Sequence, residues 1–183
     1  MSLGSVAEIE LLFATWGAEN YDEQLSQLEH ALQCAALAYE SDAAPELVAA
    51  ALLHDIGHLS EMQAGGGSDF SSDLHHEDVG RLLLVDLFPA SITDPIALHV
   101  EAKRYLVATE PTYASLLSEG SRRSLEAQGG AMSADECAGF IALPGAQVAI
   151  SLRRWDDLGK AEDLRVRPFE FYLPILDRLA LKS

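Results

Sequence analysis

Apolar residues recur at helical spacing through most of this chain, in segments bounded by proline and glycine. The clearest segment covers residues 25–38, which are rich in alanine and leucine and include neither glycine nor proline. This composition predicts a helix, because both residue types favour helical backbone. Residues 6–16 repeat apolar side chains at the same spacing. No segment shows the alternation of polar and apolar residues that is typical of a strand, so the sequence predicts an all-α fold.

A proline precedes a helix that we predict over residues 46–58, since proline suits the first helical turn. His54 and Asp55 lie near the end of this segment, and His58 follows His54 by four residues. Side chains four apart share a helical face, so His54 and His58 are expected to point to the same side. Gly57 has no Cβ, which allows another backbone or a ligand to approach closely.

The rest of the chain predicts further helices and one irregular region. Helices are expected over residues 79–88, 96–107 and 147–160, and an amphipathic helix kinked at Pro174 over residues 168–181. Residues 110–131 are the least regular, and within them residues 116–121 resemble a lid rich in hydroxyl groups. Ser133 and Glu136 predict a capping box before a short helix. No linker is long enough to divide the chain, so residues 1–183 are expected to form one helical domain.

The distribution of charge restricts the classes of partner. The 183 residues include 12 basic and 29 acidic ones, which gives a formal net charge of −17. No basic residue precedes Arg81, whereas the first 80 residues contain 15 acidic ones. Such a field repels nucleic acid and anionic membranes, and we expect neither as a partner. Solubility is the simplest interpretation of the acidity, and a metal ion or a cationic small molecule would also be tolerated.

Several features predict a cytoplasmic protein. No apolar run approaches the ~18 residues that a membrane span needs, and residues 1–14 lack the basic start of a signal peptide. Cys34 and Cys137 are far apart, in no metal-binding or redox spacing, which favours a reducing compartment. Both are expected to be buried and to behave as small hydrophobic residues.

Histidines are concentrated in one part of the chain. All six lie between residues 30 and 99. With Asp55 and Asp156 they form a nitrogen and oxygen ligand set without thiolate, which favours iron, manganese or a similar metal over structural zinc. Asp55 can bridge two metal ions, and two metals would account for the number of ligands. An isolated His-Asp pair would instead be a capped helix end or a hydrogen-bonded core histidine. His75 is expected not to be a ligand.

Two polar clusters at helical spacing have alternative interpretations. Arg153, Asp156 and Lys160 form one stripe, either a solvated salt-bridge face or a ligand carboxylate flanked by two cations that hold an anionic substrate. His99 and Lys103 are four residues apart and could form a surface face. Next to a metal, Lys103 would be an anion-binding group.

The chain resembles the HD-domain superfamily, all-helical metal-dependent proteins defined by the pattern His…His-Asp…Asp. His30, His54-Asp55 and Asp156 match this pattern in order, and His76 and His99 match the subset with two metals. More specifically it resembles the PhnZ-type diiron oxygenases, which cleave phosphonates and are related to myo-inositol oxygenase. The resemblance covers residues 21 to about 160 and rests on residues 26–33, 53–58, 76–77, 99–106, 128–130 and 153–157.

The resemblance implies a mixed-valent Fe(II)/Fe(III) pair in the core of the bundle. One iron would be held by His30, His54, Asp55 and Asp156. The other would be held by Asp55, His76 and His99.

The resemblance also implies roles in substrate binding. His58 would face the substrate, and Lys103, Ser121 and Arg153 would contact the phosphonate oxygens. Tyr21 and Glu23 are the counterparts of residues that occupy the open iron position until substrate displaces them.

The implied reaction uses dioxygen to cleave the carbon–phosphorus bond of a 1-hydroxy-2-(amino or N-methylated amino)ethylphosphonate. The products would be phosphate and a carboxylic acid of the glycine or betaine type. The alternative is a metal-dependent HD phosphohydrolase acting on a small phosphate ester through an activated water. A metal-stabilised binding or regulatory domain is a third possibility.

Overall fold

Helices provide the regular structure in a computed structural model that describes residues 2–20, 25–65, 75–161 and 164–181. In chain order they are α1 (Val6–Trp16), α2 (Gln27–Glu40), α3 (Pro45–Leu53), α4 (Ile56–Gln63), α5 (His76–Leu84), α6 (Ala90–Thr109), α7 (Tyr113–Leu116), α8 (Glu119–Ala127), α9 (Ala134–Ile141), α10 (Ala146–Leu158), the 3-10 helix η1 (Phe169–Phe171) and α11 (Leu173–Leu179). The only β pairing among these residues is an isolated bridge between Asn20 and Ser26. The predicted all-α fold is confirmed.

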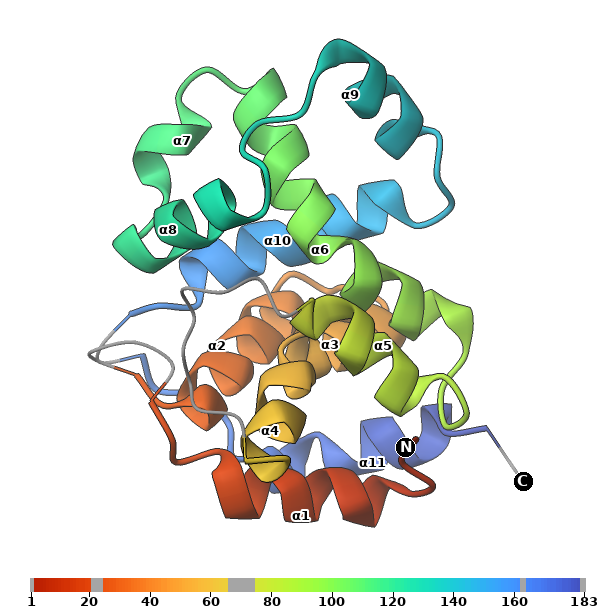
Figure 1. The fold of residues 1–183 in the computed structure, drawn as a ribbon. Helices are drawn as coiled ribbons and strands as arrows, with labels where there is room; N and C mark the ends of the chain where they lie inside the picture. The colour runs from red at the N-terminus through yellow and green to blue at the C-terminus, as the bar shows by residue number, and fades with distance from the viewer. Residues whose placement is uncertain (1, 21–24, 66–74, 162–163, 182–183) are drawn as a thin grey trace.

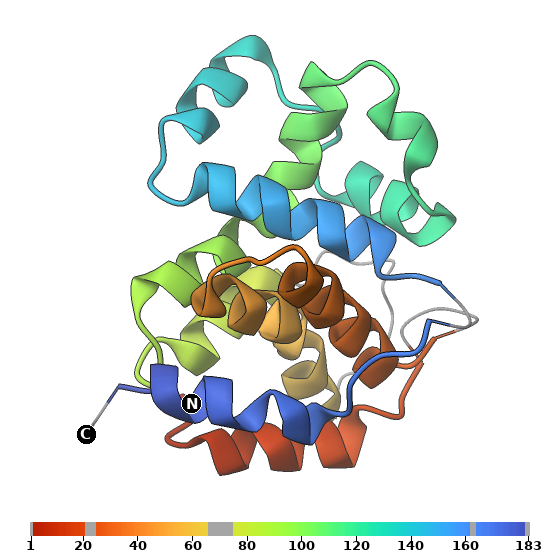
Figure 2. The ribbon, with the colours of Figure 1, turned by 180° about the vertical axis from the view of Figure 1, so that it is seen from behind.

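Helix α10 lies across the middle of the molecule, and α6 packs against it and runs from one side of it to the other (Figure 1). On one side of α10, α7, α8 and α9 surround the C-terminal half of α6 (Figure 1). On the other side lie α2, α3, α4 and α5, and α1 and α11 run side by side at the far end (Figures 1 and 2). None of the described helices is both long and apolar enough to cross a bilayer.

The main hydrophobic core fills the side of α10 that holds α2 to α5. Ile9, Leu52, Leu84 and Ile96 have at most 1% of their surface exposed, and Leu152 of α10 joins the same cluster. Complete burial of such a side chain contributes about 1.5–3 kcal/mol. Two smaller clusters lie on the other side of α10, around Phe140 and Tyr113. Helices α6 and α10 contribute to more than one of these clusters.

The predicted single helix over residues 46–58 is wrong, because the chain leaves the helical conformation at Asp55, directly after His54. Helix α3 ends at Leu53 and α4 begins at Ile56. Asp55 has φ −101° and ψ 13°, so its ψ is far from the helical value of about −42°. The argument that His54 and His58 share a helical face therefore does not apply, since they belong to separate helices.

Proline positions account for two further differences from the predicted helix boundaries. Helix α6 begins at Ala90 and continues through Pro95, although a start at residue 96 was expected. This proline lies near the helix start, where its ring removes one backbone hydrogen bond, and its neighbours Ile92 and Ile96 are fully buried. Pro174 lies in the first turn of the short helix α11, so it starts that helix and does not kink a longer one.

The region predicted to be irregular, residues 110–131, contains the helices α7 and α8. Ser118 caps α8, because its side-chain oxygen accepts a hydrogen bond of 3.1 Å from the Ser121 backbone N–H. Helix α5 ends at Leu84, four residues before the end that apolar spacing predicted.

Capping boxes fix the starts of α2 and α9. At α2, Ser26 Oγ accepts from the Glu29 N–H at 3.2 Å, and Glu29 Oε2 accepts from the Ser26 N–H at 2.8 Å. The box predicted at Ser133 and Glu136 is confirmed at α9. Each box satisfies two backbone donors that a helix start otherwise leaves without partners.

Replacing Ser26 with alanine should destabilise the protein by about 1 kcal/mol, because α2 loses its N-cap acceptor. Urea denaturation of the two proteins measures this difference. Ser41→Ala is the matched control, since Ser41 Oγ only donates to the Leu37 carbonyl at the other end of α2. The control should change stability by less than about 0.5 kcal/mol, and an equal loss in both variants would contradict the cap assignment.

Candidate functional site

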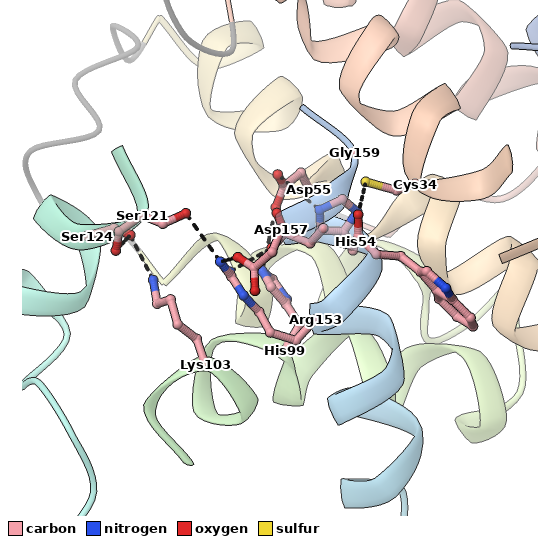
Figure 3. Close-up of polar contacts among 12 residues, drawn as sticks. Cys34, His54, Asp55, His99, Lys103, Ser121, Ser124, Arg153, Asp157 and Gly159 are labelled. Carbon is pink, nitrogen blue, oxygen red and sulfur yellow. Dashed lines mark hydrogen bonds and ion pairs between the residues drawn. The ribbon is translucent and has the colours of Figure 1, made fainter. Parts of the chain in front are cut away.

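The residues predicted to bind metal converge between the main core and α10. His30 comes from α2, His54 from the end of α3, Asp55 from the α3–α4 break, His76 from α5, His99 from α6 and Asp156 from α10. Their side chains are largely or fully buried, and His30 and His54 have no exposed surface. Part of this convergence is visible in Figure 3, where His54, Asp55 and His99 lie beside Arg153.

Asp55 lies between two pairs of histidines, and each of its carboxylate oxygens faces one pair. Oδ2 is 3.2 Å from His54 Nε2 and 3.6 Å from His30 Nε2. Oδ1 is 3.4 Å from His76 Nε2 and 3.6 Å from His99 Nε2. Burial by itself would raise the pKa of Asp55, but the adjacent His54 and His76 hold it well below its ordinary value. The carboxylate is therefore ionised and faces two separate groups of nitrogen atoms.

Backbone carbonyl groups orient three of these imidazoles. The Nδ1 atoms of His30, His54 and His99 lie 2.9, 3.0 and 2.7 Å from the carbonyl oxygens of Gly159, Ala51 and Ile96. A carbonyl oxygen can only accept, so each Nδ1 is the donor and carries a proton. In the neutral ring the other nitrogen, Nε2, then presents a lone pair.

The arrangement of these lone pairs fits metal binding. His30 Nε2 is 3.2 Å from His54 Nε2, and His76 Nε2 is 3.1 Å from His99 Nε2. Two neutral imidazoles of the first pair would face each other with lone pairs and repel. A shared cation removes this repulsion, and backbone acceptors behind metal-binding histidines are typical of metal sites. The residues present therefore fit two metal ions, one at each pair.

Sequence reasoning missed Cys34, although it follows His30 by four residues on α2. Its sulfur lies 3.7 Å from His30 Nε2 and is close enough to His30 and His54 to be considered with them as a ligand. Burial raises the pKa of this thiol well above its ordinary value. The sulfur also donates to the Trp155 carbonyl oxygen at 3.6 Å. These features favour a protonated thiol beside the metal ligands. Cys137 is only partly buried, which corrects the expectation of a buried side chain.

Asp156 connects the predicted metal ligands to a group of cations. Its Oδ1 lies 3.4 Å from His30 Nε2 and 3.1 Å from Lys160 Nζ. Its Oδ2 accepts from Arg153 Nη1 at 2.6 Å. Arg153 and Asp156 are 3% and 2% exposed, so the interpretation of this stripe as a solvated salt-bridge face is wrong.

Helix α8 contributes two serines beside these cations, and we call Lys103, Ser121, Ser124, Arg153 and Lys160 the candidate anion pocket. Ser121 Oγ lies 3.2 Å from both Arg153 Nη2 and Lys160 Nζ. On the same helix, Ser124 Oγ accepts from Lys103 Nζ at 2.7 Å. Figure 3 shows Lys103 and Arg153 extending toward these two serines. The predicted residues Lys103, Ser121 and Arg153 are thus near one another, and Ser124 and Lys160 join them.

Lys103 occupies an environment that disfavours its charge. The side chain is 2% exposed, and burial together with the Arg153 guanidinium lowers its pKa to about 7. A bound dianion would reverse this effect, because an opposite charge stabilises the ammonium form.

The other predicted residues lie at the edge of the site or outside the described residues. The rings of His58 and His76 stack with centroids 4.0 Å apart, and His58 Nδ1 lies 3.5 Å from Glu61 Oε2. His75 is exposed, and its expected absence from the ligand set stays a prediction, since it also lies close to Glu77 and Asp78. Tyr21 and Glu23 lie outside the described residues.

Gly57 allows α4 and α5 to touch through their backbones, as the sequence predicted. A Cβ at this position would lie 2.0 Å from the His76 carbonyl oxygen and 2.8 Å from its carbon. Real atoms do not approach so closely, so any side chain here would force α5 away from α4. Because His76 is the first residue of α5, this backbone contact sets its distance from Asp55.

Gly57→Ala should therefore weaken the metal position at His76 and His99 more than the one at His30 and His54. We expect a purified variant with a reduced metal-to-protein ratio, measured by elemental analysis, and a lower melting temperature. Gly139→Ala is the matched control, since no atom lies within 4 Å of its ideal Cβ and it lies inside α9. That control should keep its metal and gain up to about 1 kcal/mol. Unchanged metal content in Gly57→Ala would contradict the inference that this backbone contact positions His76 for metal binding.

Comparison with known proteins places this arrangement in a family. Residues 28–136 match the family model described as HD domain. Over 157 residues the chain is 45% identical to hydroxymethylphosphonate dioxygenase of Gimesia maris, covering 85% of this chain and 78% of the relative. Over 184 residues it is 38% identical to 1-hydroxy-2-(trimethylamino)ethylphosphonate dioxygenase (glycine-betaine-forming) of Leisingera caerulea, covering 100% of this chain and 94% of the relative.

A third relative, an uncharacterized protein of Acanthamoeba polyphaga mimivirus, is 36% identical over 164 residues, which cover 88% of this chain and 75% of the relative. The helical fold, the order of His30, His54-Asp55 and Asp156, and these matches agree with one another, and the resemblance stated from the motifs is confirmed. The chain belongs to the HD-domain family, among relatives that are named phosphonate dioxygenases.

Proposed function

We propose that this protein is a diiron oxygenase that cleaves the carbon–phosphorus bond of a 1-hydroxyphosphonate. The observation that carries the proposal is the position of Asp55, whose two oxygens face two histidine pairs. The cationic pocket formed by Lys103, Arg153 and Lys160 reaches this centre through Asp156. Asp156 therefore belongs both to the proposed metal ligands and to the surroundings of the cations. This closeness suits a substrate in which the carbon that is oxidised is bonded directly to phosphorus.

The ligand chemistry supports iron at both positions. One iron would be held by His30, His54, Asp55 and Asp156, and the second by Asp55, His76 and His99. Imidazole nitrogen and carboxylate oxygen suit iron, and the buried thiol of Cys34 is a poor ligand while it stays protonated. Bound Fe(II)/Fe(III) would supply redox chemistry toward dioxygen that amino-acid side chains lack.

The protein's own residues would bind and orient the substrate. Lys103 and Arg153, which are buried, would neutralise the phosphonate charge through charge-assisted hydrogen bonds. Ser121 lies within hydrogen-bond distance of Arg153 and Lys160, so its hydroxyl is available to the same oxygens. His58, stacked on His76, would face the substrate on the metal side. Tyr21 and Glu23 remain predictions for residues that substrate displaces.

The overall reaction balances with dioxygen as the sole oxidant. One 1-hydroxyphosphonate and one O2 give one carboxylic acid and one phosphate. The carbon that bears the hydroxyl is oxidised, dioxygen is reduced, and the carbon–phosphorus bond breaks. The pocket of cations would bind both the phosphonate and the phosphate that replaces it, since each is an anion with several oxygen acceptors on phosphorus.

For the substrate we propose a 1-hydroxy-2-(amino or N-methylated amino)ethylphosphonate. Support comes from the relative that covers the full chain and is named for the trimethylamino compound. The net charge of −17 also favours a cationic group on the substrate. The other named relative acts on hydroxymethylphosphonate, which has no amine. The amino, trimethylamino and hydroxymethyl compounds should therefore be compared directly as substrates.

Two substitutions test the proposed metal centre and the proposed anion pocket separately. Asp55→Ala should lose both irons, because each histidine pair loses the carboxylate oxygen that faces it. Lys103→Met should keep both irons and raise KM for the phosphonate by roughly tenfold or more, the loss expected for a charge-assisted hydrogen bond. Iron-to-protein ratios and steady-state kinetics measure the two effects. Full iron content in Asp55→Ala would exclude the bridging role.

The proposed reaction predicts that iron-loaded protein releases phosphate from a 1-hydroxyphosphonate only when dioxygen is present. Oxygen consumption and phosphate release should agree in amount, at one O2 per phosphate. The matched anaerobic reaction and a panel of small phosphate esters test the phosphohydrolase alternative. Phosphate released from esters without dioxygen, at rates equal to those with the phosphonate in air, would exclude the oxygenase.

A further inference from the structure

Arg153 donates hydrogen bonds to four different side chains. Its Nε donates to Tyr113 Oη at 3.3 Å, and its Nη1 donates to Asp156 Oδ2 at 2.6 Å. Its Nη2 donates to Ser121 Oγ at 3.2 Å and also to Asp157 Oδ1. A guanidinium has five N–H groups. Among the described residues, four of them therefore have partners, and the remaining one is on Nη1.

Tyr113 and Asp157 contact each other as well as Arg153. The Tyr113 hydroxyl donates to Asp157 Oδ2 while it accepts from Arg153 Nε. Burial raises the pKa of this phenol, so it keeps the proton that it donates. The three side chains form a closed ring of hydrogen bonds, which we call the Arg153 clamp. Tyr113 is 4% exposed and packs with Leu106 and Leu117, so its hydroxyl is fixed in position.

The two aspartates that contact Arg153 differ in what else they approach. Asp156 lies 3.4 Å from His30 Nε2 and is a proposed iron ligand, so a bound metal would take up part of its negative charge. Asp157 is the next residue on α10 and has Arg153 as its ion-pair partner. Asp157 and Tyr113 would therefore keep the guanidinium in place after Asp156 binds metal.

We infer that Tyr113 and Asp157 are positioning residues that fix Arg153 so that it binds the phosphonate while it still contacts Asp156. The inference rests on the proposed function, because it assigns the anion pocket to a phosphonate. The clamp occupies Nε and one N–H of Nη2. The remaining Nη1 donor and the donor now paired with Ser121 are left for the ligand oxygens.

Inorganic phosphate, the proposed product, is the probe for this inference. Tyr113→Phe removes only the hydroxyl, and Asp157→Asn keeps the shape of the side chain without its charge. Each should weaken phosphate binding to the iron-loaded protein by roughly five- to tenfold, measured by titration calorimetry. Each should raise KM for the phosphonate more than it lowers kcat, and the iron content should stay at the parent value.

Two neighbouring substitutions serve as matched controls. Tyr105→Phe removes the hydroxyl of a partly buried tyrosine that packs on Phe140. Glu110→Gln removes the 2.5 Å ion pair of Arg154, the residue that follows Arg153. Both controls should bind phosphate as the parent protein does. A loss of affinity equal to that of the clamp variants would overturn the inference.

The remaining outcomes distinguish this inference from the proposed function. If the parent binds phosphate and both clamp variants bind it equally well, the clamp has no positioning role and the proposed function stands. If a clamp variant loses iron together with phosphate affinity, the residue supports the metal centre and the inference is wrong. If the parent itself does not bind phosphate, the anion pocket and the clamp are both wrong.

Discussion

The site depends on a single carboxylate whose two oxygens face different groups of nitrogen atoms. Asp55 reaches this position because the backbone leaves the helical conformation between α3 and α4. A continuous helix would have continued through His54 and Asp55 and kept them in a regular array. The break is accommodated by close packing, since the backbones of Gly57 and His76 are in contact. Backbone geometry, more than the choice of side chain, thus sets the separation of the two histidine pairs.

Helices α6 and α10 connect this centre to the rest of the fold. Each has apolar residues in the hydrophobic clusters and polar residues in the site. Burying Lys103 and Arg153 is unfavourable unless the charges are paired. Asp156 and Asp157 offset part of that cost for Arg153, whereas Lys103 has a serine as its hydrogen-bond acceptor and a pKa near 7. The pocket brings together three basic side chains, Lys103, Arg153 and Lys160, although the protein as a whole is strongly acidic.

Much of the fold followed from the sequence, because local signals decide where helices start. The apolar spacing of α1 and the capping residues Ser133 and Glu136 were interpreted correctly. The break at Asp55 was not predicted, because apolar residues continue on both sides of it, although Asp55 and Gly57 are weak helix formers. The order of histidines and aspartates indicated which residues would converge, and the structure brings them together. Their roles as ligands remain predictions.

The residues that sequence reasoning missed are those whose partners are distant in the chain. Tyr113 lies 40 residues before Arg153, and no local pattern links the two. Ser124 was missed because residues 110–131 were not expected to form a helix. On a helix, its spacing of three residues from Ser121 places both serines on the same face. Cys34 could have been found, since it lies one helical turn after His30.

Helix α6 carries His99 and Lys103 on successive turns, and this spacing has a geometric consequence. Four residues of helix advance by about 6 Å along the axis, and a packed helix neither stretches nor shortens appreciably. The helix therefore fixes the interval between the proposed metal centre and the proposed anion pocket, like a ruler. A substrate with its hydroxyl one carbon farther from phosphorus would need a longer interval than this ruler provides. Regiochemistry, in the proposed reaction, would then be set by backbone pitch and not by a movable loop.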